Sequence, residues 1–360
     1  MFLIGLACTD PAPLPREPNE LPDDDLDVTW PERPEVDALV LEEMERAHIP
    51  GVAACTLSDF QVDWCQGYGW AELETETPAT EATPFLLASV SKTVIAVTAL
   101  EASRDGQLAL DAPLSVGFAV QHPVEVDHEI TPRMLGSHVA GIVDNWDVLE
   151  ADYVQGDSEV PLGQWCESYF VEGGERYSRR RNFGDAPEES YEYSNAGATL
   201  LAYGVEYAVG QDFADYSEER VFGPLAMDET SWHLATLDAE PAMPYTYRQG
   251  EYEAEGHYGF PDYPDGQLRS SARDLGVFLE AWGRDEDLRE IAWSGLDEDQ
   301  GFVWYRWEFA GEEIWGHNGG EVGVATEIAL FDDGRGFVVL QNGEGRWDSL
   351  YKIEEAVLGL

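Results

Sequence analysis

The sequence from residue 83 to residue 92 is Thr83-Pro84-Phe85-Leu86-Leu87-Ala88-Ser89-Val90-Ser91-Lys92, and an apolar, alanine-rich run to Ser103 follows it. A helix that begins near Ser89 places Ser89 and Lys92 on one face, because residues three apart lie one turn from each other. A serine hydroxyl becomes a nucleophile when a neighbour takes its proton, and a lysine whose pKa is lowered by burial can do so. The plain alternative is a capping serine beside an exposed lysine. The chain has only two lysines, Lys92 and Lys352, and this scarcity favours the catalytic interpretation.

Two later segments carry polar groups in patterns that suit a substrate site. The first is Tyr193-Ser194-Asn195, where a tyrosine could move a proton and an asparagine could hold a substrate amide. The second is Gly316-His317-Asn318-Gly319-Gly320, whose glycines would let a substrate approach the backbone. Taken singly, each segment is equally compatible with an ordinary turn.

Together and in this order, the three segments resemble the motifs of a family of serine hydrolases. The family comprises penicillin-binding proteins of the D,D-peptidase type, class C β-lactamases and related esterases. Its pattern S-x-x-K, Y-x-N and H-x-G matches residues 89–92, 193–195 and 317–319. Further stretches that resemble the family are 83–88, 130–138, 221–227 and 265–275. The resemblance covers residues 34 to 358.

The resemblance implies an α+β (α/β) fold of the β-lactamase and transpeptidase type. In this fold helices flank an antiparallel sheet, and a mostly helical lobe is inserted. Residues 32–360 are then one hydrolase domain, with an α/β lobe from about 34–88 and 300–360 and a helical lobe from about 89–299.

Periodicity and turn residues predict individual elements independently of the resemblance. The expected helices are 34–48, about 89–103 and about 346–358. The expected strands are 51–57, 61–68, 301–309, 313–317, 323–331 and 335–342.

The resemblance also implies a role for each matching residue. Ser89 is expected to be acylated, and Lys92 and Tyr193 to share the proton transfer. Which of the two is the general base is left open. Substrate contacts are expected from Asn195, His317, Asn318 and Gly319, and an oxyanion hole from the backbone N–H groups of Ser89 and Gly320. His317 would polarise the site or hold a substrate carboxylate. No metal or organic cofactor is implied, and His138 is interpreted as structural.

The expected activity is acyl hydrolysis through Ser89, with D,D-peptidase or D-amino-acid peptidase activity on amide bonds ranked first. Small-ester hydrolysis ranks second. Weak β-lactamase activity ranks third, because His317 stands where class C β-lactamases carry a lysine. The substrate is expected to be a small molecule or a peptide, including peptidoglycan-derived peptides. A non-catalytic envelope scaffold with the same fold is the alternative of another class. The presence of Ser89, Lys92 and Tyr193 together argues against a scaffold.

The charge of the chain excludes some classes of partner. Among 360 residues, 72 are Asp or Glu and 20 are Lys or Arg, which gives a net charge of −52. Such a chain lacks the cations that bind phosphate backbones or anionic lipids, so we expect neither a nucleic-acid partner nor electrostatic membrane docking. We expect a monomer. Adaptation to a high-salt environment and an acidic composition common to the lineage explain the net charge equally well.

Four arginines (176, 179, 180 and 181) could recruit a substrate carboxylate or neutralise neighbouring acids, and we favour neutralisation.

The first eight residues are apolar and end in Ala7-Cys8, which resembles the end of a bacterial lipoprotein signal, although a basic start and a full apolar region are missing. Residues 9–31 are rich in proline and aspartate and predict an extended tether. We therefore expect an exported protein of the cell envelope or periplasm. Lipidation at Cys8 would be its only link to a membrane.

The other cysteines fit two arrangements. Symmetric pairing of the strands over 51–57 and 61–68 places Cys55 opposite Cys65, where a disulfide would fit an oxidising compartment. Two free buried thiols fit the sequence equally well. Cys166 is expected to be buried, and no cysteine spacing resembles a zinc site.

Overall fold

The computed structural model describes residues 29–125, 127–294, 299–346 and 348–360. The expected signal segment 1–8, with Cys8, and residues 9–28 of the expected tether lie outside the described residues. No helix among the described residues is long and apolar enough to cross a membrane.

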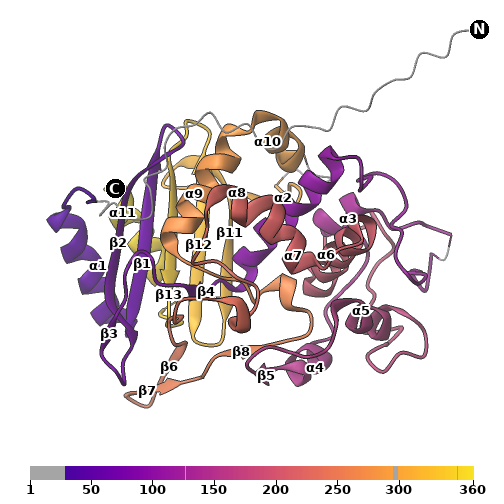
Figure 1. The fold of residues 1–360 in the computed structure, drawn as a ribbon, viewed down its shortest axis with the longest axis horizontal. Coiled ribbons are helices and arrows are strands. Elements are labelled where there is room, and N and C mark those ends of the chain that lie inside the picture. Colours follow the sequence, from indigo (N-terminus) through magenta and orange to yellow (C-terminus); the bar gives the residue numbers. More distant parts are fainter. Residues whose placement is uncertain (1–28, 126, 295–298, 347) are drawn as a thin grey trace, which may run out of the picture.

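The central element is a seven-stranded sheet in which each described pair of neighbours is antiparallel (Figure 1). Its order is β10-β11-β12-β13-β1-β2-β3. The bounds are β10 Tyr305–Phe309, β11 Glu312–Glu321, β12 Val324–Phe331, β13 Gly336–Gln341, β1 Gly51–Ser58, β2 Gln61–Glu72 and β3 Thr77–Pro78. β1 pairs with β13 in the register Val52 to Gln341, so the two ends of the chain build one sheet.

Alternation along the strands gives the sheet two apolar faces, as expected from the period of two in a β-strand. On one face Val52 and Ala54 pack with helices α1 (Pro34–Ala47) and α11 (Ser349–Leu358). On the other face Ala53 and Cys55 pack with the main core, which includes α9 (Ala272–Arg284). α9 contacts β1, β2 and β13, although it lies within the 89–299 segment that we expected to form the helical lobe. Helix α9 therefore belongs to the lobe that contains the sheet, although it comes from the middle of the chain.

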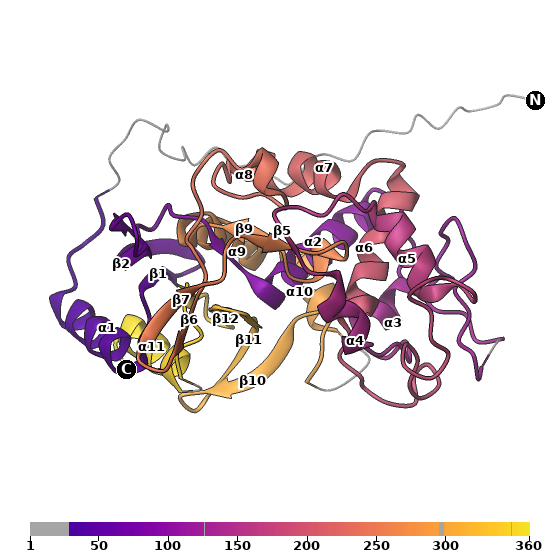
Figure 2. The ribbon, with the colours of Figure 1, turned by 90° about the horizontal axis from the view of Figure 1, so that it is seen from below.

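Short helices and loops form most of the region beside the sheet (Figure 2). The helices are α3 Pro132–Gly136, α4 Trp146–Leu149, α5 Leu162–Phe170, α6 Asn195–Val209, α7 Phe213–Ser217, α8 Gly223–Leu225 and α10 Glu286–Trp293. Three two-stranded sheets also form from short strands: β4 Phe85–Leu86 with β9 Arg269–Ser270, β5 Val154–Gln155 with β8 Tyr258–Gly259, and β6 Tyr245–Arg248 with β7 Glu251–Ala254.

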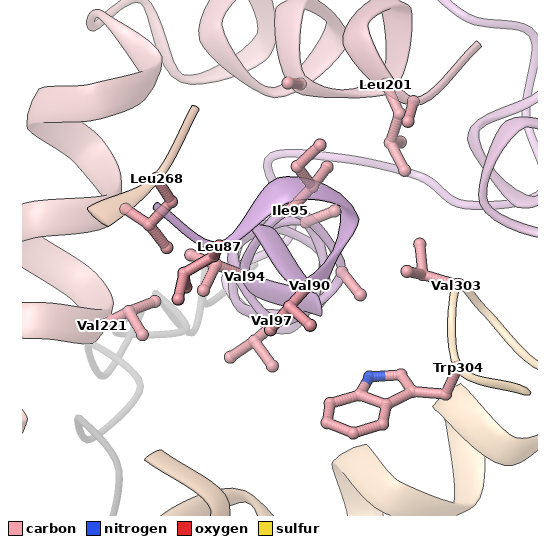
Figure 3. Close-up of a cluster of buried hydrophobic side chains, with 14 of the residues drawn as sticks. Leu87, Val90, Val94, Ile95, Val97, Leu201, Val221, Leu268, Val303 and Trp304 are labelled. Atoms are coloured by element: carbon pink, nitrogen blue, oxygen red, sulfur yellow. The ribbon is translucent and has the colours of Figure 1, made fainter. Parts of the chain in front are cut away.

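Helix α2 (Ser91–Arg104) is the buried centre of the molecule, and a 3-10 turn over Ala88–Val90 leads into it. Apolar side chains from several elements surround it, among them Leu201 of α6 and Trp304 just before β10 (Figure 3). A helix packed on all sides has little freedom to move, because interiors are close-packed. The residues at its start are therefore held in fixed positions.

The structure confirms the expected helices and strands with small changes at their ends. The strand expected over 301–309 begins at Tyr305, because the preceding residues turn with Val303 in the left-handed region at φ 74°. The strand expected over 313–317 runs on to Glu321, so the glycines of the third motif lie within it. Cys55 and Cys65 face each other across β1 and β2 and form a disulfide, and Cys166 is a buried free thiol.

Candidate active site

The first motif places a serine next to a lysine at the start of α2. Ser89 lies in the 3-10 turn, and Lys92 lies in the first turn of the helix. The Nζ atom of Lys92 donates a hydrogen bond to Ser89 Oγ at 3.0 Å. Ala88, just before the serine, has a left-handed backbone with φ 49°. Backbone strain of this kind in a residue that is not glycine is typical of functional sites.

Lys92 is fully buried and lies among negatively charged or polar groups. Its ammonium also donates to the backbone carbonyl of Asp265 and lies 5.2 Å from the centre of the Tyr193 ring. Burial alone lowers the pKa of Lys92, but Tyr193 and the Asp265 carboxylate more than offset it, so this pKa lies above its ordinary value. Lys92 is therefore a cation in the resting site. Our expectation that burial would bring this pKa below its ordinary value was wrong, because the sequence does not show that Tyr193 and Asp265 lie close enough to outweigh burial.

The second motif is held by residues that the sequence analysis did not assign to the site. Ser194 caps α6, and the Asp144 carboxylate accepts hydrogen bonds at 3.0 Å from Ser194 Oγ and from the N–H groups of Asn195 and Ala196. His138 Nδ1 accepts the N–H of Ser194 at 3.2 Å, and its ring packs 4.6 Å from the ring of Tyr193. These contacts fix the backbone next to Tyr193 and the orientation of its ring. Its buried hydroxyl interacts with the Lys92 ammonium.

The third motif brings β11 against the nucleophile. A Cβ atom on Gly319 would lie 2.4 Å from both the Leu87 carbonyl and Thr326 Oγ1, and 3.1 Å from the N atom of Ser89. Only glycine fits at this distance. Thr326 Oγ1 donates to the Leu87 carbonyl at 2.6 Å and so ties β12 to the same segment.

His317 is buried and uncharged. Its Nδ1 lies 2.6 Å from the carbonyl oxygen of Asn318, which can only accept, so the proton is on Nδ1 and Nε2 is an acceptor. Burial, together with the charge of Lys92, lowers the pKa of His317 to about 3. A neutral imidazole cannot form an ion pair with a carboxylate, so this charge state favours the first of the two expected roles of His317, polarising the site. Both roles stay predictions.

Two cavities meet at Ser89. The larger is about 720 Å³ and the smaller about 200 Å³, and Ser89, Tyr193 and Gly320 line both. Other residues of the larger cavity include Tyr191, Tyr305, Arg306, Trp307, His317 and Asn318. Other residues of the smaller cavity include Trp146, Tyr153, Asn195, Asp262, Asp265 and Glu321. A substrate bond placed at Ser89 would therefore have room on both sides.

The structure brings the residues predicted for catalysis, substrate binding and the oxyanion hole to one place. Gly319 packs against the nucleophile, and the others line one or both cavities or, in the case of Lys92, contact Ser89 directly. The catalytic roles and the oxyanion hole of Ser89 and Gly320 stay predictions. The arginines 176 and 181 pair with Asp152 and Asp147, which fits neutralisation.

The sequence analysis missed Asp144, His138 as a neighbour of Tyr193, and the carboxylates of the smaller cavity. A signal existed for His138 and for Asp265, because each lies in a stretch that resembles the family. Asp144, Asp262 and Glu321 had none, since the sequence contains 72 Asp and Glu residues.

Comparison with protein families agrees with this geometry. The model of the β-lactamase family matches residues 36–359, which is nearly the whole chain. The chain belongs to the β-lactamase family. Members of this family are serine hydrolases, so the predicted family and enzyme class are confirmed.

Curated relatives of this β-lactamase family member include a penicillin-binding protein, a hydrolase and an esterase. Penicillin-binding protein 4* of Bacillus subtilis is 26% identical over 81% of this chain and 67% of its own length. The unguisins hydrolase ungD' of Aspergillus campestris is 26% identical over 87% of this chain, and esterase EstB of Burkholderia gladioli is 28% identical over 60%. The chain spans about two thirds or less of the length of these relatives.

Solved structures confirm the predicted fold class. A penicillin-binding protein from Bacillus halodurans superposes with a TM-score of 0.73 at 21% identity, covering 89% of this chain and 98% of the other. D-amino acid amidase from Ochrobactrum anthropi superposes with a TM-score of 0.70 at 20% identity, covering 91% and 98%. At these identities the likeness concerns the fold.

Proposed function

We propose that this protein is a serine acyl hydrolase that cleaves amide bonds through a Ser89 acyl-enzyme, with D,D-peptidase or D-amino-acid peptidase activity. The observation that carries the proposal is the 3.0 Å hydrogen bond between Lys92 and Ser89, beside Tyr193, where two cavities meet. A scaffold would have no use for a buried lysine in this position, because burying a charge is costly.

In the reaction Ser89 Oγ bonds to the substrate carbonyl carbon. Because Lys92 is already an ammonium, the serine proton passes to the Tyr193 oxygen, which accepts it as a tyrosinate paired with Lys92. The carbonyl C–N bond breaks, and the leaving nitrogen takes up that proton. Water then adds to the ester of Ser89, the carboxylic acid leaves, and Ser89 regains a proton. The N–H groups of Ser89 and Gly320 would stabilise the oxyanion, an interaction worth roughly 3 kcal/mol per donor.

The neutral His317 supports amide or ester substrates over β-lactams. It offers a hydrogen-bond acceptor in the larger cavity, where class C enzymes offer a lysine charge. Efficient penicillin hydrolysis is therefore not expected. Small-ester hydrolysis is the second candidate, and the similarity to an esterase supports it.

Export to the cell envelope is also part of the proposal. The Cys55–Cys65 disulfide supports it, because disulfides persist in oxidising compartments. The similarity to a penicillin-binding protein supports it as well. The lipid anchor at Cys8 and the monomeric state stay proposals, and one solved relative is an octamer.

The test is covalent labelling of the full chain. A fluorophosphonate probe should add one adduct to the wild type, seen by intact mass, and none to Ser89→Ala. Ser103→Ala on the same helix is the control and should label like the wild type. Absence of a Ser89-dependent adduct in folded protein would leave the scaffold as the remaining function.

Penicillin, added to the same proteins, separates the activities. A lasting adduct that needs Ser89 indicates a penicillin-binding peptidase. Ring-opened product without adduct indicates a β-lactamase and would overturn the ranking of amide substrates above β-lactams. Labelling by fluorophosphonate alone indicates an amidase or esterase that does not accept β-lactams.

A further inference from the structure

The smaller cavity at Ser89 has an acidic wall that the acyl transfer does not use. Asp262 and Asp265 come from the turn between β8 and β9, and Glu321 comes from the end of β11. Neither lysine nor arginine lines this cavity within the described parts of the chain, although the Lys92 ammonium contacts two residues that do, Ser89 and Asp265. A single ammonium faces three carboxyl groups. Exposed carboxylates are commonplace in so acidic a protein, but Asp262 and Asp265 are buried and Glu321 is partly buried beside the nucleophile.

Asp262 holds a buried oxygen that lacks a partner. The residue is 2% exposed, and its Oδ1 accepts no hydrogen bond from any described residue. Burial and the nearby Asp265 raise the pKa of Asp262 well above its ordinary value, and burial raises the pKa of Asp265 to about 7. Burying an acceptor without a donor costs free energy, and a positively charged ligand in the cavity would supply the donor.

The other walls indicate what kind of cation would bind. Aromatic rings of Trp146, Tyr153 and Phe260 line the cavity, and such rings attract ammonium groups. No group of three or more His, Cys, Asp or Glu side chains is arranged to hold a metal ion in the described chain. An ammonium group has three N–H donors and no acceptor, which matches a wall of carboxyl oxygens, and its positive charge would favour the ionised form of these acids. The volume of about 200 Å³ suits one small residue.

We propose that the smaller cavity binds the free α-amino group of the substrate's acyl residue, so that the enzyme removes an unblocked N-terminal residue from a peptide or amide. The proposal rests on the proposed function, because it places the scissile carbonyl at Ser89. Asn195 lines the same cavity and could accept a further N–H of the ammonium. The leaving amine then lies in the larger cavity with His317, and it takes the proton that Ser89 gives up.

Binding is tested without turnover by calorimetry on the full-length Ser89→Ala variant. The probes are D- and L-alanine amide and their N-acetyl forms. We expect a free-amine form to bind at least 10-fold more tightly than its N-acetyl form. Adding Asp262→Asn should weaken the binding of the free amine about 10- to 100-fold, the loss typical of a hydrogen bond between charged groups.

Controls separate charge from folding. Glu206→Gln neutralises another carboxyl whose pKa burial raises to about 7, but Glu206 lines neither cavity, so binding should not change. Glu321→Gln is a second cavity variant that keeps an acceptor for the Tyr153 hydroxyl, in case Asp262→Asn fails to fold.

The outcomes for this proposal and for the proposed function are distinct. Equal binding of both forms, tighter binding of an N-acetyl form, or no binding of either would overturn the ammonium site. None of these results touches the labelling of Ser89, which tests the hydrolase function. The wild type should also hydrolyse the p-nitroanilides of D- and L-alanine and of their N-acetyl forms with the same preference for the free amine.

Discussion

At the scale of single residues, the site depends on which side chains carry charge. Lys92 stays protonated because of acidic neighbours, and His317 stays neutral because of burial and Lys92. At neutral pH Lys92 therefore carries a positive charge, and His317 carries none. His317 of the H-x-G motif therefore does not supply the positive charge of the lysine that class C β-lactamases carry at this position.

The neutral state of His317 predicts the pH dependence of a His317→Gln variant. Because the pKa of His317 is about 3, its titration should add no limb to the profile of kcat/KM between pH 4.5 and 8. With an ester such as p-nitrophenyl acetate, the variant should lose about 10-fold in rate, as for one hydrogen bond, with a profile of unchanged shape. A limb near pH 6.5 that disappears in the variant would contradict a neutral His317. A limb near pH 7 shared by both proteins would fit Asp265.

At the scale of elements, the start of α6 carries Tyr193 and Asn195 into the site, and Asp144 holds that start. An Asp144→Ala variant loses three hydrogen bonds at a helix N-terminus. We expect a loss of about 1–2 kcal/mol of stability in urea unfolding. We also expect kcat to fall about 10-fold or more with a smaller change in KM, because a misplaced Tyr193 affects the proton transfer.

Asp212 offers a matched control for this prediction. It caps α7 through the N–H groups of Ala214 and Asp215 and lines neither cavity. Asp212→Ala should cost similar stability and leave kcat unchanged. If both variants keep the kcat of the wild type, Asp144 supports only the fold.

Helices and strands were also the features that the sequence predicted best. Strands such as β1 show alternating apolar faces, and α2 is a long apolar run, so local patterns are enough to predict them. The three motifs were found because acyl transfer requires particular residue types at fixed spacings. Asp144 and Asp265 could not be found in this way. They lie 55 and 176 residues from Ser89, and no spacing rule connects a carboxylate to a lysine that only the folded chain brings near.

At the scale of the whole molecule, a buried pair of acids joins the sheet to its outer helix. Glu327 of β12 and Glu354 of α11 face each other, and burial raises the pKa of Glu327 to about 7 and that of Glu354 well above its ordinary value. The folded chain therefore binds protons more tightly than the unfolded chain, whose carboxyls titrate near 4.5. The contribution of the pair to stability is full below pH 4.5 and is lost as the pH rises through about 7.

A Glu354→Gln variant should remove much of this loss. Between pH 5 and 8.5 we expect the free energy of unfolding in urea to fall on the order of 2–3 kcal/mol less in the variant than in the wild type. The exposed Glu290→Gln serves as control and should follow the wild type. Parallel curves for wild type and Glu354→Gln would contradict the raised pKa values of these two acids.

The pairing of β1 with β13 has a consequence for how the protein is made. β1 leaves the ribosome early, but one of its two neighbours is encoded almost 300 residues later, so the sheet cannot close during translation. α1 must likewise wait for α11, its partner on the outer face. Until β13 and α11 are synthesised, the nascent chain exposes the apolar strand edges that attract chaperones or aggregate. During that time the chain remains threadable, which is the state that a translocation channel requires.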